Sequence, residues 1–117
     1  MLKTFGEKKG PLGYLWRTAV LRNAVVAAPG AYAAAIPVAS QGHAPGDAAI
    51  MRVACVAGGD AQMILNARED LAEETTLRGA FVVPAGCAYQ MVTVLVETQT
   101  RPGGVVLTLG SPAIARR

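Results

Sequence analysis

Breaks that contain glycine and proline recur at short intervals along this chain and divide it into apolar runs. The apolar runs are mostly about ten residues long or shorter, and valine and alanine make up much of their content. Such runs between turn signals are typical of all-β chains. The breaks are Pro29-Gly30, the segment Gln41–Asp47, Gly58-Gly59-Asp60, Pro84-Ala85-Gly86 and the segment Thr100–Gly104. The pattern therefore predicts an antiparallel β-sandwich or jelly roll of about seven to eight strands.

The boundaries of the expected strands follow from these breaks. The run 18–27 has an ambiguous period and could form a short helix, but Val25 and Val26 favour a strand. The segment 67–74 is the only helix candidate and could equally be a solvated loop. A short tail is expected from Ser111 onward. The expected strands are 18–27, 31–39, 48–57, 62–66, 75–83, 88–99 and 105–109.

The strand expected at 88–99 has the clearest pattern in the chain. Val92, Val94 and Val96 alternate with Met91, Thr93 and Leu95, so both faces of this strand are largely apolar. Such a strand belongs in the middle of a sheet or at a subunit interface. The residues expected to form that core or interface are Met91, Val92, Val94, Leu95 and Val96.

The first 17 residues differ in composition from the rest and are expected to form a flexible, basic N-terminal arm. Gly6, Gly10 and Gly13 favour a mobile backbone in this segment. Large aromatic side chains on a mobile arm can anchor a subunit to a partner. Alternatively, Tyr14 and Trp16 cover the protein's own core. Residues 18–117 would then form the one folded domain. The candidate anchoring residues are Phe5, Lys8, Lys9, Tyr14 and Trp16.

The composition narrows the classes of partner. Hydrophobic residues make up 52% of the 117 residues but aromatic ones only 5%, which suits a thin core between two sheets or burial against another subunit. A net charge of +3 lacks the dense basic stripe of a nucleic-acid-binding protein, so no nucleic acid is expected. The longest uncharged run, 23–41, contains Pro29-Gly30 and is too weakly hydrophobic for a bilayer span, so no membrane and no cleaved leader are expected.

The chain offers few residues for chemistry. His43 is the sole histidine and has no cluster of further ligands, so neither a metal nor a cofactor is expected. Ser40 lies near His43, but no nucleophile motif surrounds it. Cys55 and Cys87 are expected to be buried free thiols, although a single bridge is possible if their strands are neighbours. No catalytic residue is expected, and the chain is predicted not to be an enzyme.

One stretch resembles a known group of proteins. An apolar strand is followed by Val83-Pro84-Ala85-Gly86, two further residues and Tyr89 at the start of the next strand. Over about residues 76–110, this resembles small β-sandwich proteins of tailed-bacteriophage particles, of the decoration, fibre or head–tail attachment type. The resemblance implies a non-enzymatic, homo-oligomeric virion component that is assembled in the host cytoplasm. Its partners would be other virion proteins and copies of itself.

Two other functions were weighed against the virion role. The first alternative is a β-sandwich module that binds carbohydrate or another ligand. Sugar-binding surfaces expose Trp or Tyr for stacking, and the sole tryptophan lies in the expected arm. The second, a metal enzyme of the cupin type, needs several histidines and is set aside because only one is present.

Overall fold

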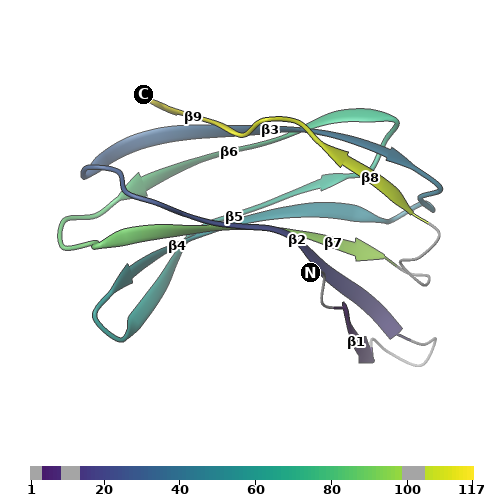
Figure 1. The fold of residues 1–117 in the computed structure, drawn as a ribbon, viewed down its shortest axis with the longest axis horizontal. Helices are drawn as coiled ribbons and strands as arrows, with labels where there is room; N and C mark the ends of the chain where they lie inside the picture. Colours follow the sequence, from purple (N-terminus) through teal and green to yellow (C-terminus); the bar gives the residue numbers. More distant parts are fainter. Residues whose placement is uncertain (1–3, 9–13, 99–104) are drawn as a thin grey trace.

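The chain folds into two antiparallel β-sheets that pack face to face (Figure 1). The computed structural model describes residues 4–8, 14–98 and 105–117, and the side chains of residues 17–98 and 105–117. These parts of the chain contain nine strands and no helix, and therefore no helix that could cross a membrane. The predicted all-β sandwich is confirmed.

The first sheet has five strands and the second has four. In the first, the order is β1 (Thr4–Lys8), β2 (Tyr14–Val25), β7 (Tyr89–Thr98), β4 (Ala48–Ala57) and β5 (Asp60–Asp70). In the second, β3 (Gly30–Gln41) pairs with β6 (Glu74–Val83) on one edge. Its other edge pairs with β8 (Val106–Leu109) and β9 (Ala113–Arg116). The chain alternates between the sheets, so neither sheet could form without the other.

The core lies between the sheets and is built from alternate residues of four strands. Val92, Val94 and Val96 of β7 are at most 5% exposed, and they face the interior together with Met51 and Val53 of β4. The second sheet contributes residues of β3 and β6, namely Tyr32, Ala34, Ile36, Val38, Leu77, Phe81 and Val83. The central position expected for the strand at 88–99 is confirmed, because β7 is the middle strand of the five.

The helix considered for residues 67–74 is wrong. β5 continues to Asp70, and its last residues pair with the start of β4. Leu71 is buried in the core, and β6 already begins at Glu74. Pairing and burial of this segment outweigh the weak helical preference of its acidic residues.

Both ends of the described chain carry strands that differ from the expectation. The expected C-terminal tail instead forms β9, which pairs with residues 32–35 of β3. β2 begins at Tyr14 and pairs with β1, and the domain boundary expected at residue 17 stays a prediction. The turn expected at Thr100–Gly104 lies outside the described residues, and the mobility of the arm stays a prediction.

Cys55 and Cys87 form a disulfide bond, so the expectation of two free thiols is wrong. Cys55 lies on β4, and Cys87 lies in the turn that precedes the neighbouring strand β7. The Cα atoms are 5.6 Å apart, within the usual range for a bridge. The condition set by the sequence, that the flanking strands be neighbours, is therefore met.

The hairpin between β4 and β5 gives a matched pair of test positions. Gly58 has a φ of 60°, a conformation that side chains rarely adopt, whereas Gly59 is not among the glycines with positive φ. A Cβ atom at either position would meet no other atom within 4 Å. We expect Gly58→Val to lower the free energy of unfolding by about 1 kcal/mol or more and Gly59→Val to change it little, as measured by urea denaturation. Equal losses at both positions would contradict the turn geometry.

The middle of β7 gives a second test. Val94 has no exposed surface, so Val94→Asp places an unpaired charge between the sheets. We expect this variant to lose about 3 kcal/mol or more of stability, or to fail to fold, in thermal and urea unfolding. The control is Val82→Asp, because Val82 is 63% exposed on β6 and should tolerate the charge. If Val94→Asp melted like the wild type, β7 could not be the central strand.

Candidate functional site

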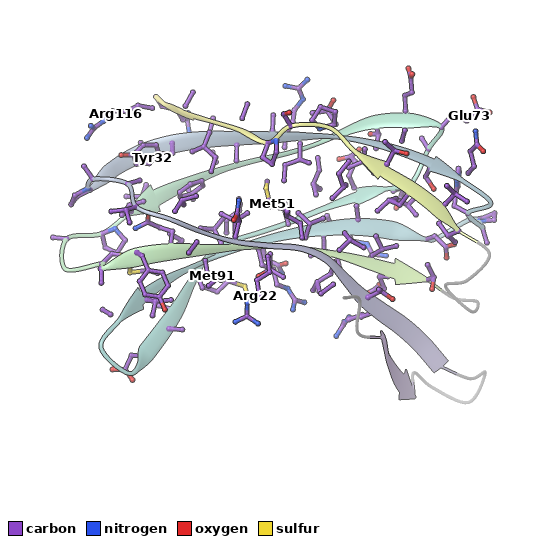
Figure 2. All side chains as sticks on the ribbon, in the orientation of Figure 1. Arg22, Tyr32, Met51, Glu73, Met91 and Arg116 are labelled. Atoms are coloured by element: carbon purple, nitrogen blue, oxygen red, sulfur yellow. A yellow bond between two sulfur atoms is a disulfide. The ribbon has the colours of Figure 1, made fainter. Side chains whose placement is uncertain are left out.

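The outer face of the five-stranded sheet, which points away from the core, carries most of the large polar side chains that could contact a ligand. Figure 2 shows Met51 between the sheets, whereas Arg22 and Met91 point away on the opposite side of the five-stranded sheet. The β4–β5 hairpin and the β1–β2 ladder both extend beyond the sandwich on that side (Figure 1). The outer face therefore lies between two projecting parts of the same sheet.

An irregularity in β2 decides that Arg22 belongs to this face. Ala19 pairs with Leu95, but the next pair along is Leu21 with Val94, so β2 has one extra residue at Val20. Side chains of a regular strand alternate between faces, and that alternation would place Arg22 on the core side with Thr18. The β-bulge reverses the alternation, so Arg22 lies opposite Thr93 on the outer face.

A second bulge acts in the same way on β5, at the other side of the sheet. Leu65 pairs with Val53, and Met63 pairs with Ala54, so Ile64 is the extra residue. Ile64 and Leu65 both pack against the core. Met63 is thereby displaced to the outer face, where its side chain is 53% exposed. Each bulge keeps two adjacent apolar residues inside, and Arg22 on β2 and Met63 on β5 therefore lie on the outer face.

The outer face has a polar row and an apolar row. Arg22, Thr93, Arg52 and Asn66 occupy successive strands in one cross-strand row. Two residues away along β7 the row is apolar, with Met91, Ala54 and Met63 on three successive strands. Tyr89 follows at the end of β7 and is 36% exposed. An aromatic ring, two methionines and several hydrogen-bonding groups therefore share one surface.

At the opposite end of β7 from Tyr89, a buried carboxylate links side chains of three strands. Glu97 accepts a hydrogen bond from Arg17 Nε at 3.0 Å and another from Arg68 Nη1 at 2.6 Å. Its side chain is 4% exposed, whereas those of Arg17 and Arg68 are 31% and 46% exposed. Burial by itself raises the pKa of Glu97, but the hydrogen bonds and charges of both arginines outweigh it and lower the pKa below its ordinary value of 4.5. Glu97 is therefore ionised at neutral pH and neutralises part of the charge on the two arginines.

Arg52 is in a different situation from the arginines beside Glu97. Its Nε atom is buried and has no hydrogen-bond partner among the described residues. Leaving such a donor unpaired costs stability, so an unpaired buried donor in a folded protein calls for an explanation. Neither Arg52 nor Arg22 takes part in an ion pair within the described part of the chain.

The outer face of the second sheet offers less. Shallow hollows on it are lined mainly by alanine, threonine and proline, including Ala33, Ala35, Pro37 and Thr76. One of them borders the acidic pair Glu73 and Glu74, but none is lined by an aromatic residue. This face has few groups that could bind a ligand strongly.

The few residues that could take part in catalysis make contacts that stabilise the fold. Ser40 Oγ lies 3.1 Å from His43 Nδ1, but Ser40 is 1% exposed and its side chain lies beneath the surface. Asp47 Oδ2 accepts a hydrogen bond from the Ala44 amide at 2.8 Å, which closes the loop before β4. Within the described residues, no three His, Cys, Asp or Glu side chains come together as a metal site.

The expected partner-binding residues fall into two groups. Phe5, Lys8, Tyr14 and Trp16 lie in the paired strands β1 and β2, and Lys9 lies outside the described residues. No observation tests whether these residues anchor a partner. In β7, Val92, Val94 and Val96 belong to the core, whereas Met91 and Leu95 point to the outer face and are half-buried.

Sequence analysis did not identify Arg22, Arg52, Asn66 or Glu97 as site residues. The alternation in 48–57 placed Arg52 opposite the buried Met51 and Val53, which was a usable signal. For Arg22 the same alternation leads to the wrong face, because the bulge in β2 leaves no mark in the sequence.

The fold was compared with known proteins. No protein-family model and no curated protein matches the sequence. The fold is similar to a family 61 carbohydrate-binding module in complex with β-1,4-galactotriose, at 14% identity and a TM-score of 0.56, over 99% of this chain and 88% of that one. It is also similar to the family 22 xylan-binding domain of Xyn10C from Paenibacillus barcinonensis, at 9% identity and a TM-score of 0.57, over 100% of this chain and 87% of that one.

A third similar structure contains the CBM22-1 and GH10 modules of xylanase 10B from Clostridium thermocellum complexed with xylohexaose. The identity is 11% and the TM-score 0.57, and the match covers 100% of this chain but only 24% of that one. These three likenesses establish the fold, a sandwich of the kind seen in carbohydrate-binding modules. None of the three is a virion protein, and the virion role with its oligomeric partners stays a prediction.

The ion pairs of Glu97 predict how stability depends on pH. Because the pKa of Glu97 is lowered in the folded state, its contribution is complete above about pH 4.5 and is lost as the pH falls through the folded-state pKa. We expect Glu97→Gln to reduce the free energy of unfolding by about 1–3 kcal/mol at pH 7. Urea denaturation should show the gap to the wild type narrowing as the pH falls below about 4.5. The exposed Glu74→Gln is the control, and a gap that does not change with pH would contradict the role of Glu97.

Proposed function

We propose that this domain is a non-catalytic carbohydrate-binding module that holds a glycan on the outer face of its five-stranded sheet. The observation that carries the proposal is the combination of Tyr89, Met91 and Met63 with Arg22, Thr93 and Asn66 on one accessible surface. Sugars present apolar ring faces and polar hydroxyl groups, and this surface matches both. Two of the similar structures, a carbohydrate-binding module in complex with β-1,4-galactotriose and a xylan-binding domain, are glycan-binding proteins of the same fold, which supports the proposal.

The dimensions of the surface suit a chain of sugars. Tyr89, Met91 and Thr93 point outward at every second position of β7. Four residues of extended strand span about 13 Å, which is longer than one sugar ring. A ring stacked on Tyr89 would therefore leave the next part of the glycan over the polar row.

The backbone around Tyr89 is fixed on both sides. Cys87 is bonded to Cys55, and the Ala88 amide donates a hydrogen bond to the Val56 carbonyl at 2.9 Å. Gln90 has no exposed surface, and its Oε1 accepts a hydrogen bond from the Ala27 amide at 2.8 Å. An aromatic ring on such a rigid base loses little conformational entropy when it binds a sugar. Sugar-binding surfaces expose Trp or Tyr for stacking, and Tyr89 can fill this role although the sole tryptophan lies elsewhere in the chain.

Tyr89→Ala tests this site. We expect it to weaken glycan binding about tenfold, because stacking on the ring is lost, and to leave the melting temperature nearly unchanged, because the ring is exposed. The measurement is affinity electrophoresis and calorimetry against a panel of soluble neutral and charged polysaccharides. The control Val82→Ala removes an exposed apolar side chain from the other sheet. If the wild type bound no polysaccharide of the panel, the proposed function would be wrong; unchanged binding by Tyr89→Ala would place the site elsewhere.

A further inference from the structure

We propose that the glycan held on the outer face is anionic, with a carboxylate or sulfate group that lies over Thr93 between Arg22 and Arg52. This inference rests on the proposed function and specifies the chemistry of its ligand. Three features of the face carry it: the position of the two arginines, the buried Nε–H of Arg52, and the distribution of acidic residues.

The two arginines flank the same point of the central strand. Arg22 on β2 and Arg52 on β4 are both register partners of Thr93 on β7. Two strand spacings separate their Cα atoms by about 10 Å, and two arginine side chains can converge across that distance. Thr93 adds a hydroxyl group between them. Two guanidinium groups beside a hydroxyl group form a receptor for an oxyanion.

Arg52 has a donor that lacks an acceptor in the described part of the protein. Its Nε atom is buried with no hydrogen-bond partner. Because this Nε atom is closed to solvent, a carboxylate or sulfate would bond to it only once the Arg52 side chain turns outward, so that Nε and one Nη face the ligand. A neutral sugar hydroxyl would satisfy the same donor more weakly, because it carries no negative charge to attract the guanidinium group.

Among the described residues, no acidic side chain of this face forms an ion pair with Arg22 or Arg52. Glu97 is occupied by Arg17 and Arg68, and it lies four residues along β7 from Thr93. Among the residues whose side chains are described, Asp70 is the other carboxylate on this face, and it lies at the far edge of the sheet in the same row as Glu97. Glu97 thus pairs with Arg17 and Arg68. Arg22 and Arg52 lie beside the apolar row without an acidic partner among the described residues.

The neighbouring apolar row argues for a sugar as the carrier of the charge. Met91 and Tyr89 continue outward along β7 from Thr93. A free inorganic anion would make no use of these side chains, whereas the ring of an acidic sugar would pack against them. Acidic glycans of two kinds present the required group, uronic acids through a carboxylate and sulfated sugars through a sulfate ester.

Substitution of the two arginines tests the inference in the intact domain. Binding is measured by calorimetry to polygalacturonate and chondroitin sulfate, with xylan and β-1,4-galactan as neutral glycans and poly-glutamate as a charged polymer without sugar. We expect the wild type to prefer an acidic glycan at least tenfold over the neutral ones and over poly-glutamate. Arg22→Gln and Arg52→Gln should each weaken that binding about tenfold and reduce its salt dependence. Arg78→Gln is the matched control, since Arg78 is exposed on the second sheet.

A second variant separates binding from folding. Arg52→Met removes the unpaired buried Nε–H, so we expect a melting temperature equal to or above that of the wild type, together with lost acidic-glycan binding. A lower melting temperature with unchanged binding would give Arg52 a structural role and overturn the inference.

The other outcomes distinguish the two proposals. Preference for polygalacturonate identifies the carboxylate, and preference for chondroitin sulfate identifies the sulfate. Binding to neutral glycans alone would overturn this inference and leave the proposed function standing. Equal binding to poly-glutamate would reduce the site to general charge attraction and overturn the inference, and no glycan binding at all would overturn both.

Discussion

The packing of β7 and β4 against β3 and β6 is the contact on which the rest of this molecule depends. Each strand contributes alternate side chains, so the core is one layer of valine, isoleucine, leucine and methionine with Tyr32 and Phe81 at one end. Those two rings stack with centroids 5.7 Å apart, and the guanidinium group of Arg116 lies over Tyr32. Because neither sheet can bury its apolar face alone, the outer faces are left free to differ in chemistry.

The two β-bulges create that difference. A regular β2 and a regular β5 would leave Arg22 and Met63 on the core side of the sheet. The extra residues, Val20 and Ile64, keep the apolar layer continuous, and Arg22 and Met63 lie on the outer face as a result. The same local distortion therefore completes the core and equips the surface, which is the use to which bulges near binding sites are often put.

Different interactions order the two ends of the outer face. At one end, Glu97 orders Arg17 and Arg68 through two charged hydrogen bonds. At the other end, the Cys55–Cys87 bridge and the buried Gln90 fix the chain on either side of Tyr89. Between them lie Arg22 and Arg52, whose guanidinium groups have no acidic partner among the described residues. The two ends of this surface are held by bonds within the protein, whereas the Nε–H of Arg52 near its middle lacks an acceptor. Such a surface suits a ligand that supplies the missing acceptor.

The sequence by itself determined the local structure of most of this chain. Glycine and proline breaks set the positions of the main turns, and the apolar patterns of 48–57 and 88–99 identified strands there, because both effects act within a few residues. In 88–99 both faces are largely apolar, so the sequence left open which of its residues face inward. Only the tertiary structure decided which strands are neighbours, and hence that Cys55 and Cys87 are bridged. It also decided that residues 67–70 extend β5 rather than form a helix. Finally, it decided the face on which Arg22 lies, because a bulge depends on how one strand pairs with another, and no pattern within a single strand encodes that pairing.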